Sequence, residues 1–260
     1  MKRILLITLM AASALSLAAQ PSANEIMKKS RDQAKVSGLE SRTKLEIHDG
    51  KGNTRVRETT MASRTFPDGT EKRVIVFLAP ADVKGTSMLI FDYDKKEDDM
   101  WVYMPALRKS RKIVSSEKTK SFMGSEFSNS DLAVGNIDDF TYTLDGTETV
   151  DQQECWIIKM VPANPQIAAD YGISSKVAWI AKKDYITRKV VFLDAANAAF
   201  KEMYFTGIKL LDPATQKYFV THMEIKNLKN NRFSVMNMDQ ISLNPAVKEE
   251  FFTLSFIEKQ

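Results

Sequence analysis

Few residues in this sequence could bind a metal ion or take part in catalysis. The chain has two histidines, His48 and His222, and each lies where apolar and polar residues alternate. Neither has a second histidine, a cysteine or a carboxylate at the spacing typical of a metal site. We therefore interpret both as solvated or hydrogen-bonded strand residues and expect no metal.

The single cysteine and one acidic segment are the other candidates for chemistry. Cys155 excludes an internal disulfide, and its apolar neighbours in ECWIIKM favour a buried, inert thiol over a reactive one. The segment DYDKKEDD, residues 92–99, lacks the central glycine and full ligand pattern of a calcium-binding EF-hand, so a solvated turn is the better interpretation. The sequence contains no nucleophile elbow and no phosphate-binding glycine loop. We expect no catalytic residues, no cofactor and no enzymatic activity.

An unusual segment, MWVYMPALRKSRKI, spans residues 100–113 and places aromatic residues and methionines directly before cationic residues. Alternation along a strand puts Trp101 and Tyr103 on one face and the intervening apolar residues on the other, and the sequence leaves open which face is interior. Pro105 ends the strand. The cations that follow could bind an anionic headgroup or the acidic face of a partner. The alternative is a solvated basic turn beside a core strand.

The elements that must position these residues are mainly strands. Residues 22–36 have the composition of a helix, with Ser22 or Asn24 as the N-cap. Beyond them apolar and polar residues alternate, and turns such as DGKGN at 49–53 join the strands into hairpins. About 10 to 11 strands in one antiparallel sheet would curl, so a half-barrel or closed barrel is predicted rather than a flat layer.

The remaining segments are a long loop and two short helices. Residues 114–139 form the loop, with one helical turn near Asp131, and loops of this length are usually functional or disordered. Short helices are predicted at 163–172 and 244–252. Nothing in residues 20–260 marks a domain boundary, so a single domain is expected there.

Residues 1–19 have the pattern of a secretory signal peptide, with Lys2 and Arg3 before an apolar run and small residues at its end. We therefore expect export to the periplasm, without a lipid anchor because no cysteine follows the cleavage site. Removing the two basic residues of the signal lowers the formal net charge from +4 to +2. So small an excess argues against binding to nucleic acid.

The chain contains 13 methionines, and many of them fall in predicted strands or in the long loop. Flexible thioether side chains suit a surface that must repack around ligands of variable shape. They equally suit an ordinary core, and counting alone slightly favours that interpretation.

Several segments together resemble the LolA-like superfamily of periplasmic lipoprotein and lipid carriers, in the branch called outer-membrane lipoprotein-sorting proteins. The similar segments are DMWVYMPALRKSRKI, FMGSEFSNSDL, VDQQECWIIKM, NPAVKEEFFTLSFIEK and, less specifically, GLESRTKLEI. The resemblance implies a mainly β (α+β) fold, with a curved antiparallel sheet forming an incomplete, half-open barrel, an N-terminal helix and short lid helices.

The resemblance also implies a non-catalytic chaperone that shields acyl chains in an apolar cavity. It would shuttle a lipoprotein or lipid from an ABC- or RND-type inner-membrane transporter to an outer-membrane acceptor, in outer-membrane biogenesis. The alternative is an envelope sensor of the same fold that binds a partner protein. The residues expected at the acyl cavity and its lip are Trp101, Tyr103, Met104, Leu107, Phe122, Met123 and Phe127. Those expected to contact a headgroup or partner are Arg42, Arg108, Lys109 and Arg111.

Overall fold

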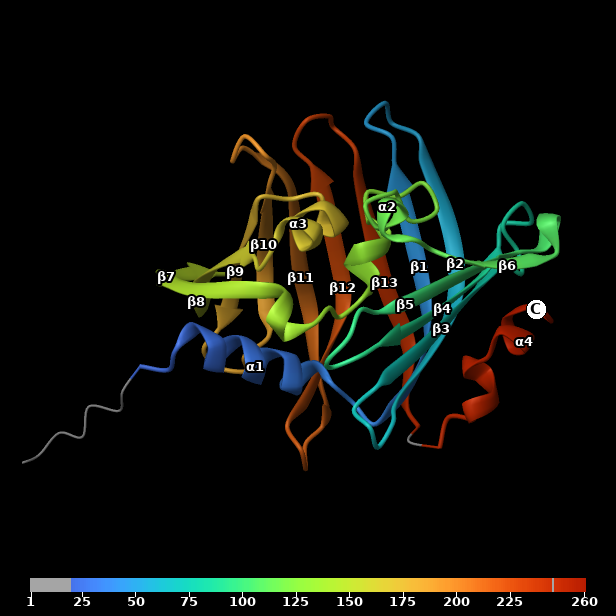
Figure 1. Cartoon of the computed structure of the whole chain (residues 1–260), viewed down its shortest axis with the longest axis horizontal. Coiled ribbons are helices and arrows are strands. Elements are labelled where there is room, and N and C mark those ends of the chain that lie inside the picture. Colours follow the sequence, from blue (N-terminus) through green and yellow to red (C-terminus); the bar gives the residue numbers. More distant parts are fainter. Residues whose placement is uncertain (1–19, 245) are drawn as a thin grey trace, which may run out of the picture.

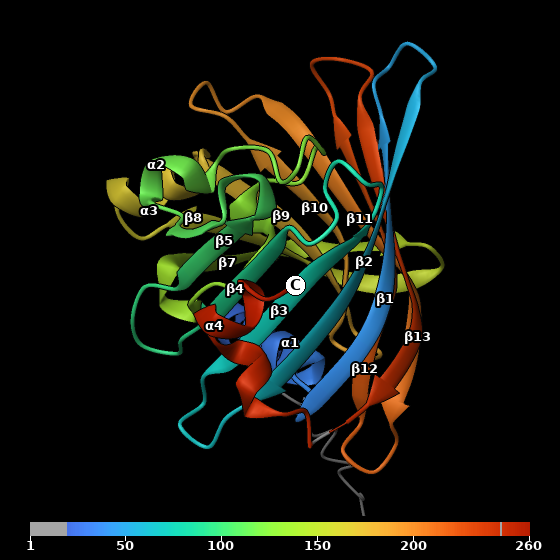
Figure 2. The same ribbon diagram turned by 90° about the vertical axis from the view of Figure 1, so that its right-hand side faces the viewer.

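The computed structural model of the chain describes residues 20–244 and 246–260, and the predicted signal peptide lies outside them. The described residues form one antiparallel sheet of 13 strands, in the order β6-β5-β4-β3-β2-β1-β13-β12-β11-β10-β9-β8-β7. Strands β6 and β7 are its two edges, and the sheet curls into an incomplete barrel (Figures 1 and 2). The predicted mainly β, half-open barrel is confirmed.

The strands range from 4 to 14 residues in length. Their bounds are β1 Gly38–His48, β2 Thr54–Thr65, β3 Glu71–Ala79, β4 Ser87–Asp92, β5 Asp99–Met104, β6 Lys109–Lys112, β7 Phe140–Val150, β8 Gln153–Pro162, β9 Ser175–Ala181, β10 Thr187–Leu193, β11 Ala199–Asp212, β12 Lys217–Asn227 and β13 Phe233–Leu243.

The sheet has more strands than the 10 to 11 predicted, and β6 is one that the sequence pattern does not reveal. Its residues, KSRK, lack any apolar alternation, yet they pair with β5 from Trp101–Lys112 to Met104–Lys109. An edge strand needs only one partner and no buried face, so hydrophobic periodicity carries no signal for it.

Helix α1, Ala23–Ala34, crosses the concave side of the sheet (Figure 1). Its N-terminus carries the predicted Ser22 cap as a capping box: the Glu25 amide donates to Ser22 Oγ at 3.3 Å, and the Ser22 amide donates to Glu25 Oε2 at 2.8 Å. Ile26 is fully buried beneath the helix. The cap and this apolar face fix the helix over the sheet.

The long loop runs through the inside of the barrel. It contains α2 Ser115–Lys118 and the 3-10 turns η2 Asn129–Leu132 and η3 Ile137–Asp139. Between them the Phe122 amide donates to the Phe127 carbonyl at 2.7 Å, and both rings are buried. The tight turn requires positive φ at Met123 (50°) and at Gly124 (82°), which glycine adopts without strain. We call residues 121–128 the plug.

The C-terminal residues cover the convex side. Here η4 Glu249–Phe252 and α4 Leu254–Ile257 lie outside β3 and β4 (Figure 2). Phe252 and Ile257 are buried in a second hydrophobic cluster with Leu89 and Tyr103. The predicted helix at 163–172 is α3 Pro165–Tyr171. Another 3-10 turn, η1 Pro105–Leu107, joins β5 to β6.

We expect Phe252→Ala to lower the free energy of unfolding by roughly 3 kcal/mol, because it empties the centre of the convex cluster. Urea unfolding measures this difference. The control Leu254→Ala removes an exposed side chain of the same segment and should change stability by less than about 0.5 kcal/mol. Equal effects of the two substitutions would show that the C-terminal segment is not packed as described.

Candidate functional site: an apolar cavity under helix α1

A cavity of about 490 Å³ lies between the concave face of the sheet, helix α1 and the segment from η2 to η3. This volume is within the range of roughly 300–1,000 Å³ typical of small-molecule sites. Strands from both halves of the sheet contribute to its walls, as do Met27 and Ala34 of α1. The cavity exists because the curved sheet is wider than the helix and loop that cover it.

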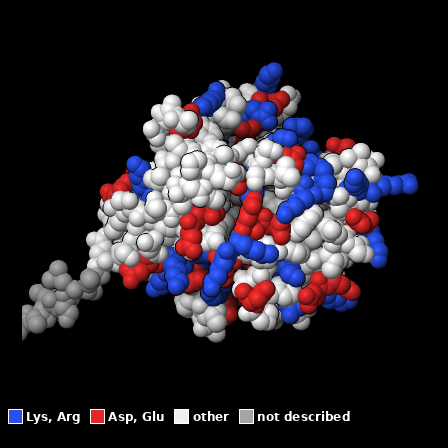
Figure 3. All heavy atoms as spheres, in the orientation of Figure 1, with Lys and Arg blue, Asp and Glu red and all other residues white. Residues whose placement is uncertain are grey.

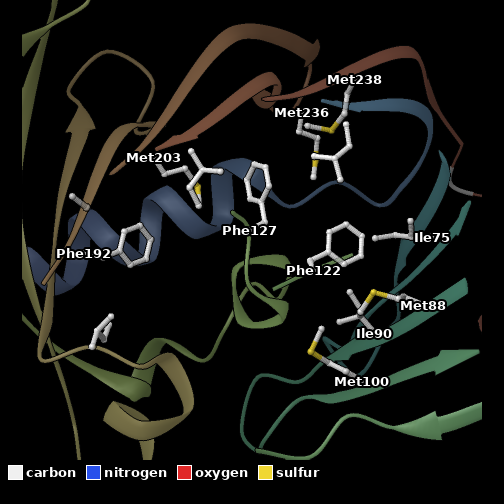
Figure 4. Close-up of a cluster of buried hydrophobic side chains, with 14 of the residues drawn as sticks. Ile75, Met88, Ile90, Met100, Phe122, Phe127, Phe192, Met203, Met236 and Met238 are labelled. Atoms are coloured by element: carbon white, nitrogen blue, oxygen red, sulfur yellow. The ribbon is translucent and has the colours of Figure 1, made fainter. Parts of the chain in front are cut away.

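Large, flexible apolar side chains line most of the wall. Inward positions alternate along each strand, for example Met236 and Met238 of β13 and Met203 and Phe205 of β11. In Figure 4 the plug ring Phe127 lies between Phe192 and Met203 on one side and Met236 and Met238 on the other, and the ring of Phe122 lies beside Ile75. The methionines of the wall are Met27, Met61, Met160, Met203, Met223, Met236 and Met238.

A charged network ties the loop to the sheet at the β3–β4 side of the cavity. Arg73 donates to the Leu132 carbonyl at 2.6 Å and to Glu71 Oε1 at 2.7 Å. The Val134 amide donates to Asp92 Oδ1 at 2.8 Å. Although burial opposes it, the carboxylates of Glu71 and Asp92 hold the pKa of Arg73 above its ordinary value. These contacts fix the segment that roofs the cavity.

The ionised carboxylate of Asp92 is poorly stabilised in this network. Its carboxyl is only 3% exposed, and its Oδ2 atom has no hydrogen-bond donor, with Arg73 Nη2 3.8 Å away. Burial raises the pKa of Asp92 to about 7, and that of Asp98 to about 6. The prediction of a solvated turn at 92–99 is therefore wrong for Asp92. This carboxylate faces inward at the end of β4.

The same turn holds helix α1. Arg31 Nη2 lies 2.6 Å and Lys35 Nζ 3.1 Å from Asp94 Oδ1. Figure 3 shows acidic and basic side chains intermingled across the middle of this face of the molecule. Since Arg31 and Lys35 also line the cavity, these ion pairs connect the helix that covers the cavity to the turn between β4 and β5.

Lys176 lines the cavity on the side opposite β3 and β4. It belongs to β9, on the same face as Ala178, and both line the cavity. Its Nζ lies 4.3 Å from the centroid of the Phe140 ring and 4.5 Å from that of Tyr171. Burial lowers the pKa of Lys176 to about 8, despite the nearby Asp131.

Of the residues predicted at the acyl cavity, Phe122 lines it. Phe127 is 1% exposed in the same core cluster, and Met104 and Met123 pack against that cluster. The plug thus fills the barrel instead of forming a lip at the rim. Its two phenyl rings are buried because the loop enters the sheet's concave side.

Trp101 and Tyr103 are placed differently from the prediction. Both pack in the convex cluster, with the Trp101 ring 5.2 Å from that of Phe91. Strand alternation then turns Met100 and Val102 inward. Leu107 is 64% exposed in η1 and does not line the cavity. The aromatic residues face outward because the C-terminal segment gives them a second, convex core.

The four cations predicted to contact a headgroup or partner lie away from the cavity wall. Arg42 is exposed on β1, between the inward-facing Ser41 and Thr43. Arg108 follows η1, and Lys109 and Arg111 are exposed on the edge strand β6. Arg111 is paired with Glu117 at 2.5 Å. A headgroup inside the cavity is thus out of their reach, and contact with a partner stays a prediction.

The cysteine and the two histidines are engaged in packing or in contacts with neighbouring side chains. Cys155 is fully buried, and burial raises the pKa of its thiol. His48 stacks on Phe233 at 4.0 Å between ring centroids, and His222 Nδ1 lies 2.6 Å from Asn237 Oδ1. The prediction of hydrogen-bonded strand histidines is confirmed. In residues 20–244 and 246–260 no group of three or more metal-binding side chains occurs, and no helix there is long and apolar enough to span a membrane.

Sequence reasoning missed Lys176, Arg73 and Asp92. A signal for Lys176 was present, since SKVAWIA places the lysine in register with the inward residues Ala178 and Ile180. Arg73 and Asp92 are charged residues at the ends of apolar strands, where solvent exposure is the usual outcome. Their burial depends on the loop from η2 to η3, whose path no local pattern encodes.

Comparisons with known proteins agree with this fold. A model described as that of an uncharacterized protein family matches residues 69–259. A DUF1329 family protein from Desulfovibrio piger is 27% identical, with a TM-score of 0.83 over 90% of this chain and 97% of the other. No curated protein matches the chain.

Two further solved structures share the fold. A domain of an outer-membrane lipoprotein-sorting protein from Vibrio parahaemolyticus is 22% identical, with a TM-score of 0.83 over 91% of this chain and 98% of the other. A LolA superfamily protein from Nitrosomonas europaea is 15% identical, with a TM-score of 0.67 over 91% of this chain and all of the other (100%). For the fold, the resemblance predicted from the sequence is confirmed.

The buried Asp92 predicts a pH dependence of stability. Its pKa is about 4 in an unfolded chain and about 7 in the fold. The folded protein therefore binds this proton more tightly, so the stability that Asp92 contributes is full below about pH 4 and is lost as the pH rises through about 7. We expect the melting temperature to fall between about pH 5 and pH 7 and to level off above pH 7, and Asp92→Asn to remove much of that fall.

Thermal melts across this pH range measure the effect. The control is Asp212→Asn: hydrogen bonds from Thr215 lower the pKa of this exposed carboxyl, so it stays ionised throughout. If the melting temperature of Asp92→Asn fell with pH as steeply as that of the unchanged protein, Asp92 would not be the source of the pH dependence.

Proposed function

We propose that this chain, which belongs to the DUF1329 family and has the fold of the LolA superfamily, is a non-catalytic carrier that binds acyl chains in the cavity under α1. The observation that carries the proposal is the cavity itself. It is of ligand size, and its walls are mostly Met, Phe, Leu, Ile and Val side chains.

The energetics favour such a ligand. Each buried methylene contributes about 0.8 kcal/mol, so a chain of some fourteen carbons gains on the order of 10 kcal/mol before the costs of binding are subtracted. No reacting group is needed, because the carrier only shields the chain from water. The seven methionines of the wall suit the task, since unbranched thioethers repack around chains of different length.

Helix α1 is the element that we propose to move when ligand enters. Apart from Ile26 and its neighbours, much of its attachment consists of the ion pairs of Arg31 and Lys35 with Asp94. Asp94 is 43% exposed, while Arg31 is 13% and Lys35 is 20% exposed, so water reaches one partner of each pair and weakens the attraction. A helix held in this way can be displaced without unfolding the sheet.

In the proposed pathway residues 1–19 direct export to the periplasm, and an inner-membrane transporter loads the carrier. Support for a lipoprotein or lipid cargo comes from the fold shared with the lipoprotein-sorting domain of Vibrio parahaemolyticus. The exposed cations Arg108, Lys109 and Arg111 at the β6 edge, together with Arg42, are proposed to contact an acidic partner in this pathway.

Mass spectrometry of the native protein tests the proposal. The chain, with its own signal, is produced in a bacterial periplasm, purified without detergent and extracted for lipids. About one acylated molecule per protein is expected, since the cavity has the volume of a single ligand. A folded protein that is empty, and that does not take up acyl chains when they are added, would contradict the carrier and favour a sensor that binds a partner protein.

A substitution that fills the cavity should block binding. Met223 lines the wall of β12 and is only partly buried, so Met223→Trp places a large ring in the cavity. We expect the affinity for hexadecanoate to fall at least about tenfold, with a melting temperature within a few degrees of the unchanged protein. Titration calorimetry measures the affinity.

The matched control is Leu228→Trp, which adds the same ring at an exposed position outside the cavity. It should leave binding unchanged. Unimpaired binding by a folded Met223→Trp protein would place the acyl site elsewhere.

A further inference from the structure

Lys176 has an unusual position for a lysine. Strand alternation turns it to the concave side with Ala178 and Ile180, and its side chain enters a mostly apolar cavity. Its Nζ faces the rings of Phe140, Tyr171 and, at 5.8 Å, Phe192. Aromatic faces attract a cation, but they accept no strong hydrogen bond from it.

The other cations of the cavity wall are paired with carboxylates. Arg73 contacts Glu71 at 2.7 Å, and both Arg31 and Lys35 contact Asp94. Within the part of the chain that the structure describes, Lys176 is the cavity-lining cation without an ion pair or hydrogen bond to a protein group. A half-buried ammonium group without a partner costs free energy, and an anion would offset that cost.

The ionisable groups nearest to Lys176 already have partners. Asp131 accepts from Lys201 at 2.7 Å and from the Ser128 amide at 2.8 Å. Asp139 accepts from the Tyr171 hydroxyl at 3.4 Å and from the Asn136 amide at 3.3 Å. These carboxylates attract Lys176 at a distance without contacting it, so its three N–H donors remain available.

We propose that Lys176 binds the oxyanion headgroup of a single-chain amphiphile whose acyl chain extends along the apolar wall toward Met236 and Met238. Phe192, which pairs with Lys176 across β9 and β10, and the two methionines all line the cavity, and Figure 4 shows them on opposite sides of the plug ring Phe127. The inference rests on the proposed function and adds its specificity: the cavity selects acyl ligands that carry a negative charge.

The test compares two probes of equal chain length, hexadecanoate and hexadecan-1-ol, on delipidated protein by titration calorimetry. The unchanged protein should bind the carboxylate about tenfold more tightly or better, because a charge-assisted hydrogen bond forms only with the anion. In Lys176→Met the preference should disappear while the alcohol binds within about twofold of its original affinity. Lys176→Arg keeps the charge and should keep most of the preference.

The pH dependence of the hexadecanoate affinity distinguishes a ligand-binding lysine from a lysine with only a structural role. Because burial lowers the pKa of Lys176 to about 8, the hexadecanoate affinity should decline above about pH 8, where the ammonium loses its proton. The other ionisable groups around Lys176 are Asp131, Asp139 and Lys201, of which Asp131 and Lys201 form an ion pair at 2.7 Å. In Lys176→Met the affinity should be flat over the same range.

Stability separates a ligand-binding role from a structural one. Lys176→Met removes an unpaired buried charge, so the empty variant should melt at a higher temperature than the unchanged protein. A lower melting temperature would show that Lys176 stabilises the fold through contacts of its own, which overturns the inference.

The outcomes distinguish this inference from the proposed function. If the unchanged protein binds both probes equally, Lys176 has no headgroup role and the carrier stands. If acetate or inorganic phosphate binds as tightly as hexadecanoate, the site is one for free anions and the inference fails. If neither probe binds, the acyl carrier and the inference that rests on it fail together.

Discussion

The constraint on which this structure depends is that a sheet of 13 strands curls but does not close. Its concave face is apolar and must be covered by something other than another strand. Helix α1 and the plug, residues 121–128, cover part of it, with Phe122 and Phe127 buried between the two halves. The space that they enclose but do not fill is the cavity of about 490 Å³, so the proposed ligand completes a core that the chain itself does not fill.

Charges are distributed around this cavity according to their roles. Arg73 and Asp92 hold the roof through hydrogen bonds with the Leu132 carbonyl and the Val134 amide, and Asp94 holds α1 through its ion pairs with Arg31 and Lys35. Such pairs give orientation more than stability, because desolvation offsets much of their attraction. Lys176 lies on the opposite wall without a carboxylate partner, which is the arrangement expected of a site that is completed by its ligand.

Much of the fold could be predicted from the sequence, because alternation and capping are local signals: the Ser22 cap, the hairpins and the turn at Asp131 all appear as expected. The site could be predicted only in part. Trp101 and Tyr103 face the convex cluster because residues 247–257 return to cover them, a contact between segments about 150 residues apart. The inward position of Asp92 likewise depends on the path of the long loop. Local periodicity gives the two faces of a strand, but only long-range packing decides which face is interior.

The most direct test of the central claim, that the acyl chain binds under α1, is NMR of the protein with ¹³C-labelled methionine methyl groups, titrated with hexadecanoate. The account predicts shifts for the methyl groups of the cavity wall, such as Met203, Met223 and Met236, while Met88 and Met100, buried in the core but outside the cavity wall, stay in place. Binding of hexadecanoate that leaves the NMR signals of the wall methionines unshifted would contradict an acyl site under α1.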